Sequence, residues 1–191
     1  MKMLEIDEIF RKATRGPQII TKKDLGIIVS ETGVRSGWKV VDAGTGSGFL
    51  AMFLANLGCE VYTYEDDKRW FDIAQKNFKE FGFKNIHLKF KDVLKGIDEK
   101  NIDMVTIDMR GAEKVIKDAY EKLRNGGYIV FYSLHIEQMQ KIFKELRKYK
   151  FSRVRYLENI QREWQIEGST YTRPKTEMLG HTGFLIFAKK T

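Results

Sequence analysis

Residues 40–48 read VVDAGTGSG, an apolar run and one acid followed by glycines at positions 44, 46 and 48. This order is typical of a buried strand that turns sharply into a helix beside a bound ligand. The dinucleotide fingerprint G-x-G-x-x-G needs a glycine where this chain has Phe49. The phosphate-loop pattern G-x-x-x-x-G-K-[ST] does not occur in the chain. The loop therefore argues against a diphosphate ligand, and the rest of the chain has to identify what it binds.

The segments around this loop alternate between β-branched runs and stretches with helical spacing, as βαβ units require. From residue 151 onward the pattern changes to strand-like segments that end in GFLIFAKK. The sequence predicts a doubly wound, Rossmann-like α/β sheet whose last strands form an antiparallel pair at one edge. We expect strands at 39–43, 60–64, 86–90, 104–107 and 128–132, and helices at 22–32, 49–57, 70–81, 115–123 and 136–146. Thr21 can cap the first of these helices, and Gly33 can end it in the left-handed conformation.

The composition is that of a globular protein long enough to bury one core, with 191 residues of which 42% are hydrophobic. We expect a single domain over 1–191, with 1–14 as a short helical extension. The chain has no apolar run of 18 residues, no apolar leader and one cysteine, Cys59, so the sequence predicts no membrane span and a cytoplasmic location. Its three histidines lack metal-ligand spacing.

The formal net charge of +8 favours a polyanionic partner such as a nucleic acid. Surfaces rich in lysine and glutamate also occur in heat-adapted proteins without that role, so the charge leaves both interpretations open. The candidate contacts are two basic sets, Arg11, Lys12, Arg15, Lys22, Lys23 and Arg147, Lys148, Lys150, Arg153, Arg155.

Acidic residues follow successive predicted strands at the edge where such sheets bind ligands. Glu65 ends the second strand, about 20 residues beyond the first glycine, where a carboxylate binds both hydroxyls of a ribose. Asp92 follows the third strand and could accept a proton from an adenine amino group, and Asp108 follows the fourth. A ribose and an adenine without a diphosphate describe S-adenosylmethionine. Alternatively, the glycines make a plain tight turn and the acids are solvated, but their joint placement favours the cofactor.

Six segments in order resemble one known family over roughly residues 15–190. They resemble the tRNA adenine-N1 methyltransferases of the TrmI type. The first and last are the most specific, because class I methyltransferases in general share the glycine loop. The segments are RGPQIITKKD (15–24), VVDAGTGSG (40–48), YTYEDDKRWFDIA (62–74), KDVLKGI (91–97), IDMRGAEKV (107–115) and GHTGFLIFAKK (180–190).

The resemblance implies a seven-stranded class I methyltransferase domain that methylates N1 of a T-loop adenine in tRNA, usually as a homotetramer. It implies that Asp108 is catalytic and that Tyr132 borders the target-base pocket. The cofactor-binding set it implies is Gln18, Asp42, Gly44, Thr45, Gly46, Ser47, Gly48, Glu65, Asp92 and Asp108.

The chemistry of Asp108 agrees with this role. Adenine N1 has a lone pair and no proton, so it needs no strong base. A carboxylate at Asp108 could accept a hydrogen bond from the exocyclic amine, stabilise the developing positive charge and align N1 with the methyl group. The target base must leave its stack to enter such a pocket. The alternative for Asp108 is a helix N-cap or a plain strand-end acid.

Three features depart from the family pattern. Only 14 residues precede Arg15, where family members usually carry a small β-rich domain that grips RNA. The family motif D-L-P-x-P reads DMRGA from Asp108 here, without the prolines that would stiffen the loop. Thr21 occupies a position that is commonly aromatic or histidine in the family, and threonine cannot stack on a base. We therefore expect an intact cofactor site and an altered base site.

Two other functions stay open. A small-molecule methyltransferase of the precorrin type would use the same scaffold without RNA. A tRNA-binding subunit would need a partner protein, which could also replace the missing N-terminal domain, but a subunit without activity need not keep the cofactor residues. An NAD-dependent reductase is disfavoured by the glycine spacing. We interpret His181 as a structural histidine bonded to backbone, and Trp164 as a core residue, a subunit contact or a base-stacking surface.

Overall fold

The computed structural model describes residues 4–16, 18–167 and 171–191. Residues 1–3, in the predicted N-terminal extension, and residue 17, within RGPQ, lie outside the described part of the chain.

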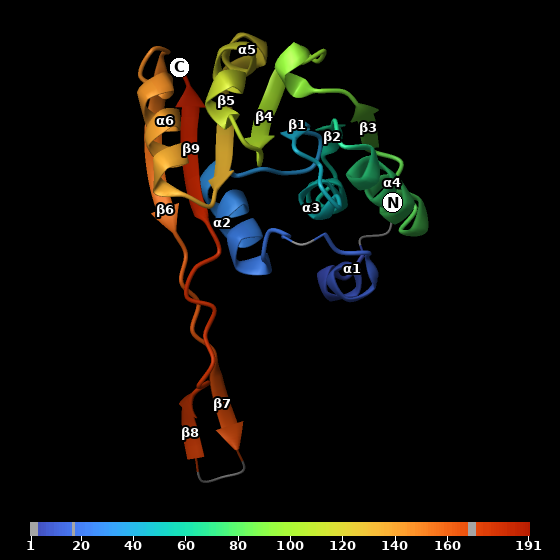
Figure 1. Ribbon diagram of the computed structural model, residues 1–191, viewed down its shortest axis with the longest axis vertical. Coiled ribbons are helices and arrows are strands. Elements are labelled where there is room, and N and C mark those ends of the chain that lie inside the picture. Colours follow the sequence, from blue (N-terminus) through green and yellow to red (C-terminus); the bar gives the residue numbers. More distant parts are fainter. Residues whose placement is uncertain (1–3, 17, 168–170) are drawn as a thin grey trace.

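Seven strands form the central sheet: β1 (Lys39–Ala43), β2 (Glu60–Glu65), β3 (Ile86–Phe90), β4 (Ile102–Ile107), β5 (Leu123–Ser133), β6 (Phe151–Glu158) and β9 (Phe184–Lys190). Their order is β3-β2-β1-β4-β5-β9-β6 (Figure 1). The first five pair in parallel, whereas β9 is antiparallel to both β5 and β6. The predicted fold class is confirmed, and β9 lies one position inside the edge that it forms with β6.

Helices cover both faces of this sheet, as a doubly wound fold requires (Figure 1). One apolar core lies under α1 to α4 and the other under η2, α5 and α6. No helix within the described ranges is long and apolar enough to cross a membrane. The helices are α1 (Ile6–Lys12), α2 (Lys22–Thr32), α3 (Phe49–Asn56), α4 (Lys68–Glu80), α5 (Ile116–Lys122) and α6 (Ile136–Leu146), with 3-10 turns η1 (Val93–Lys95) and η2 (Ala112–Val115).

The junction between α5 and β5 differs from the prediction. Leu123 was expected in the helix, but α5 ends at Lys122 and β5 already begins at Leu123. Gly127 explains how β5 starts so close to β4, because a Cβ there would lie 3.1 Å from the carbonyl oxygens of Ile102 and Asp103. The close backbone approach therefore lengthens both strands beyond their predicted starts.

Helix α2 ends as predicted at Gly33, but its start differs from the prediction. Gly33 adopts the left-handed conformation with φ +68°, and its N–H bonds to the carbonyl of Val29, as a helix-ending glycine does. Thr21 precedes the helix, but its hydroxyl donates to Asp24 at 2.8 Å instead of accepting a bond from the first turn. The prediction that the Thr21 side chain caps the helix is wrong, because a buried carboxylate competes for that hydroxyl.

The N-terminal helix α1 packs onto the body of the protein. Ile9 and Phe10 are buried, and the Phe10 ring lies 5.0 Å from that of Phe49 on α3. The Asn56 side chain accepts from Leu4 N at 2.8 Å and donates to Leu4 O at 2.9 Å. The short helix expected within 1–14 is therefore present in the described residues and tied to α3.

Residues 159–167 and 171–183, between β6 and β9, form an arm that projects from the sheet (Figure 1). Its outer part is the antiparallel pair β7 (Trp164–Glu167) and β8 (Tyr171–Pro174). Six large apolar side chains of the arm are exposed: Ile160, Trp164, Ile166, Tyr171, Met178 and Leu179. The strand-like segments were expected, but their projection away from the core was not.

Candidate active site

The glycine loop lies against the end of β4. Gly44 has φ +94°, and a Cβ there would meet the carbonyl oxygen of Asp108 at 2.2 Å. The Asp108 N–H in turn donates to the carbonyl of Ala43 at 2.9 Å. Only glycine permits this contact of backbone with backbone, so the loop sequence places Asp108 beside the loop.

Glu65, at the end of β2, holds the same loop from the other side. Its Oε2 accepts from Gly46 N at 2.8 Å, and its Oε1 accepts from Asp66 N and Asp67 N at 3.1 and 3.0 Å. Burial raises the pKa of Glu65 above its ordinary value, while these backbone N–H groups act against the rise. The carboxylate is thus fixed at the loop before any ligand is present.

Asp42 lies beneath the loop and is fully buried. Its two oxygens accept from Thr106 Oγ1 at 2.7 Å and Thr63 Oγ1 at 2.8 Å, and Thr45 Oγ1 lies 2.6 Å from the Thr63 hydroxyl. Burial raises the pKa of Asp42 to about 6, against the effect of the two hydroxyls. This network connects three strands below the site.

Asp108 follows β4, and its side chain is exposed to solvent while it lines both cavities at the glycine loop. Desolvation in these cavities, followed by the charge of Asp42, raises the pKa of Asp108 to about 7. Contact with water screens such effects and acts to limit the rise. These effects together hold the pKa of Asp108 above its ordinary value.

Two cavities flank the glycine loop, one of about 220 Å³ and one of about 240 Å³. They share four lining residues: Gly44, Gly46, Trp70 and Asp108. The first adds Gly16, Gln18, Ile19, Ile20, Thr45, Ser47, Phe49 and Leu50, and the second adds Tyr64, Glu65, Asp66, Lys91, Asp92, Val93 and Met109. The two compartments together form an elongated site across the loop.

Most of the predicted cofactor residues meet at these cavities, and three predicted residues do not line them. Asp42 is buried below. Gly48 has φ +85°, and a Cβ there would lie 2.4 Å from the ring of Phe78, so this glycine is required for packing. Tyr132 is 9% exposed and donates to the carbonyl of Thr182 at 2.7 Å. The structure shows Asp42 and Gly48 supporting the loop from below, and the predicted roles of Asp42, Gly48 and Tyr132 in binding stay predictions.

Trp70 is a site residue that the sequence reasoning missed. Its helical spacing indicated the apolar face of α4, but its ring lines both cavities and packs against Gly16, where a Cβ would lie 3.2 Å away. The available signal was its position just after β2, in the turn that begins α4 at the ligand edge. Asp67 caps that turn, accepting from Arg69 N at 2.8 Å.

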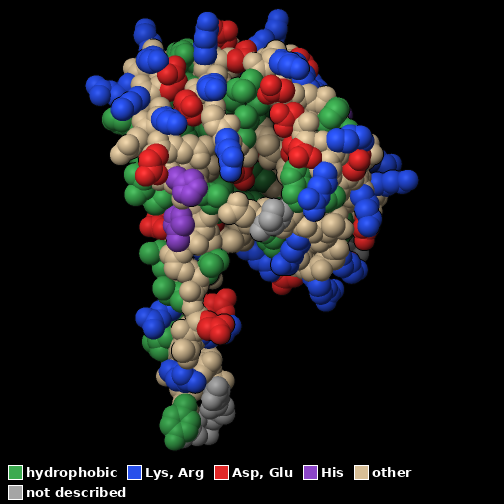
Figure 2. Space-filling view, viewed as in Figure 1, with side chains coloured by type: hydrophobic (Ala, Val, Ile, Leu, Met, Phe, Trp, Pro, Cys, Tyr) green, Lys and Arg blue, Asp and Glu red, His purple; other side chains and the backbone are tan. Residues whose placement is uncertain are grey.

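The structure bears on the predictions for three residues outside the cavities. His181 bonds to Glu158 at 2.6 Å and to the carbonyl of Leu134 at 3.3 Å, which confirms a structural histidine. Trp164 is 61% exposed, so a core role is wrong and the surface roles remain. The Lys23 side chain is 9% exposed and paired with Asp24, so its ammonium group is already bound within the protein, and its role as an RNA contact stays a prediction. Figure 2 shows the other basic side chains scattered over the visible face rather than gathered in one patch.

The sheet order, the glycine loop after β1 and the acids after β2, β3 and β4 define a class I methyltransferase fold. Comparison with known proteins shows which family within this class the chain belongs to. The family model described as tRNA methyltransferase complex GCD14 subunit matches residues 12–172, and the chain belongs to this family. The resemblance inferred from the six sequence segments is confirmed.

Individual relatives agree with this assignment. The tRNA (adenine(57)-N(1)/adenine(58)-N(1))-methyltransferase TrmI of Methanocaldococcus jannaschii is 32% identical over 95% of this chain and 75% of its own length. The crystal structure of tRNA (m1A58) methyltransferase TrmI from Aquifex aeolicus has a TM-score of 0.91 at 27% identity, covering 98% of this chain and 76% of its own. A SAM-dependent O-methyltransferase from Thermotoga maritima has a TM-score of 0.90 at 28% identity, covering 97% and 71%.

Proposed function

We propose that this chain binds S-adenosylmethionine across the two cavities and transfers its methyl group to N1 of an adenine in tRNA. The observation that carries the proposal is the convergence of Glu65, Asp92 and Asp108 on one glycine loop. Each cavity alone is smaller than a usual small-molecule site, but the volume of the two together falls within the range of such sites. Membership of the family and the names of the relatives support tRNA as the substrate.

The ribose would bind at Glu65. A carboxylate offers about four lone-pair positions, and three backbone N–H groups already occupy three of them. The position that remains is on Oε2, whose one donor among the described residues is Gly46 N. One ribose hydroxyl can therefore bind without rearrangement, and a second requires Glu65 to release Asp66 N or Asp67 N.

The adenine of the cofactor would lie beside Asp92. Asp92 Oδ1 accepts from Leu94 N at 2.8 Å and begins η1. Its Oδ2 has no hydrogen-bond partner among the described residues, so it is available to an amino group. Trp70 lines both cavities and would offer an apolar wall to the ligand. The methionine end would occupy the compartment lined by Gln18 and Ser47.

Asp108 carries the chemistry on the substrate side. When bound, S-adenosylmethionine supplies an electrophilic methyl group. Adenine N1 carries no proton, so the reaction needs no base there. The role left for the Asp108 carboxylate is to orient the exocyclic amine and balance the positive charge that the ring gains. Because the pKa of Asp108 is raised to about 7, the fraction in this active form increases as the pH rises through 7.

A homo-oligomer is the proposed assembly. The arm exposes six large apolar side chains, Trp164 and Ile166 among them at 61% and 76% exposure. A two-stranded hairpin is at best marginally stable alone in water, so a partner surface would stabilise it. The number of subunits proposed, four, rests on the resemblance to the TrmI type.

The test is transfer of labelled methyl groups from S-adenosylmethionine to unmodified tRNA transcripts by the purified protein. We expect incorporation into tRNA, and a fall of about 100-fold in kcat for Asp108→Asn, measured at saturating cofactor because Asp108 also lines the cofactor cavities. Asp72→Asn is the matched control, because Asp72 is an exposed carboxylate paired with Lys68 on α4. Cofactor binding without transfer to any tRNA would instead support a small-molecule substrate or a missing partner protein.

A further inference from the structure

A buried charged cluster lies beside the site and has no part in the chemistry described above. Asp24, on the first turn of α2, is 0% exposed. Its Oδ2 accepts from the hydroxyls of Thr21 and Thr182, both at 2.8 Å, and its Oδ1 accepts from Lys23 Nζ at 2.8 Å. We call these four residues, with Tyr132, the Asp24 cluster; the Tyr132 hydroxyl lies 3.5 Å from Asp24 Oδ2.

The Asp24 cluster joins segments that are distant in the sequence. Lys23 Nζ also donates to the carbonyl of Asn159 at 2.5 Å and to Thr182 Oγ1 at 2.6 Å. The Asn159 side chain donates back to the carbonyl of Lys23 at 3.0 Å. Asn159 and Thr182 are the two ends of the arm, so the cluster clamps both ends of the arm to the start of α2.

The end of β5 is fixed by the same contacts. The Tyr132 hydroxyl donates to the carbonyl of Thr182, and the Tyr132 ring packs on Gly183, where a Cβ would lie 2.6 Å from the ring. This close approach explains the second glycine of GHTGF. The cluster thus fixes Tyr132, the residue that the family resemblance places at the target base.

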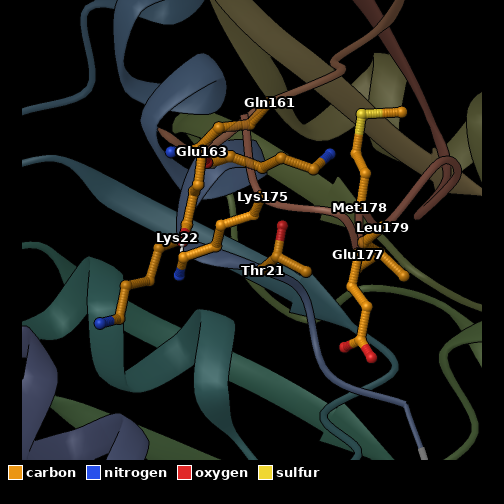
Figure 3. A pocket seen from close by; sticks show the side chains of 9 residues that line it. Thr21, Lys22, Gln161, Glu163, Lys175, Glu177, Met178 and Leu179 are labelled. Atoms are coloured by element: carbon orange, nitrogen blue, oxygen red, sulfur yellow. Dashed lines mark hydrogen bonds and ion pairs between the residues drawn. The ribbon is translucent and has the colours of Figure 1, made fainter. Parts of the chain in front are cut away.

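The segment that enters α2 connects the cluster to the site. Ile20 lines the cavity that contains Asp108, and Thr21, the next residue, lines a separate cavity of about 700 Å³ at the base of the arm. Figure 3 shows that the side chains around this larger cavity come from two elements, the start of α2 and the arm. A shift of the cluster would therefore move the wall between the two cavities.

We propose that Asp24 and Thr182 are positioning residues that fix the target-base side of the methyl-transfer site. They act through Thr21, Tyr132 and the base of the arm, and they do not touch the cofactor cavities. A charge buried this completely requires all its partners, so loss of one hydroxyl lets the segments that it joins rearrange. This inference rests on the proposed tRNA methylation and adds residues that determine how the substrate is held.

The test compares Thr182→Val with two other variants. Thr182→Val removes the hydroxyl at nearly constant volume, whereas Thr182→Ser keeps it and should restore the cluster. Thr32→Val is the matched control, because Thr32 is 6% exposed, lies at the other end of α2 and donates its hydroxyl to the carbonyl of Ile28 at 2.7 Å. For each variant, kcat and KM for tRNA, the cofactor Kd and hydrogen exchange of residues 18–24 and 179–184 are measured.

We expect Thr182→Val to lower kcat/KM for tRNA at least tenfold with the cofactor Kd within twofold, and to raise exchange in both segments. Thr182→Ser and Thr32→Val should stay within threefold of wild type. An equal loss in Thr182→Val and Thr32→Val, or unchanged exchange in Thr182→Val, overturns the proposal. If the wild type methylates no tRNA, the proposed function fails, while the exchange data still decide whether the cluster fixes these segments.

Discussion

Replacement of Asp42 by Asn should stabilise the protein relative to wild type by an amount that grows with pH. Asp42 is 1% exposed, and among the described residues its carboxylate is bonded to the hydroxyls of Thr63 and Thr106 and to no positively charged group. An Asn amide can accept from Thr106 and donate to Thr63, whose hydroxyl also reaches Thr45. The substitution therefore removes a buried charge and keeps the network.

The size of this stability difference follows from the pKa of Asp42 in the folded and in the unfolded protein. Burial raises the pKa of Asp42 from 3.8 to about 6 in the folded state. The folded protein thus binds this proton more tightly than the unfolded chain, so the contribution of Asp42 to stability is greatest below pH 4 and is lost as the pH rises through 6. At about 1.4 kcal/mol for each pKa unit, the loss is about 3 kcal/mol.

The assay is urea unfolding of wild type and Asp42→Asn between pH 4 and pH 8 at one ionic strength. Other titrating groups largely cancel in the difference, which should widen by about 3 kcal/mol toward pH 8 in favour of the variant. The charge of Asp42 also raises the pKa of Asp108, so the acidic limb of the pH–rate profile should move to lower pH. A difference in stability that stays constant with pH would refute this reasoning.

Three further outcomes follow from the geometry. Gly44→Ala should destabilise the protein by at least about 2 kcal/mol and abolish cofactor binding, because φ is +94° and the methyl group would overlap the Asp108 carbonyl. Thermal unfolding measures the stability and calorimetry the binding, and a normal cofactor affinity would contradict this prediction. Trp70→Ala should weaken cofactor binding about tenfold in calorimetry, and an unchanged Kd would remove Trp70 from the site. Trp164→Glu combined with Ile166→Glu should shift the sedimentation coefficient to a smaller species, whereas an unchanged value would exclude these residues from the subunit interface.

Local patterns were sufficient to predict the parallel sheet and the ligand edge. The glycine loop and the acids Glu65, Asp92 and Asp108 occupy positions that depend only on strand order and on where each strand ends. Gly33 likewise ended its helix as expected, because a left-handed residue is a local requirement.

The remaining features depend on contacts between distant segments. Trp70 has the spacing of a core residue, and only the position of α4 beside the loop places it at the two cavities. Thr21 was expected to cap α2, but its hydroxyl is taken by Asp24, which also accepts from Thr182, 158 positions away. The direction of the arm could not be predicted either, since its exposed apolar side chains are typical of ordinary strands.

The most direct test of the proposed reaction identifies the atom that receives the methyl group. Transfer RNA incubated with the protein and S-adenosylmethionine is digested for mass analysis of its nucleosides, and a parallel sample is reverse transcribed, because a methyl group on N1 blocks pairing. We predict N1-methyladenosine and a single stop in wild-type samples, both strongly reduced with Asp108→Asn. Methylation at another atom, or cofactor binding with no modified nucleoside, would contradict the proposed reaction.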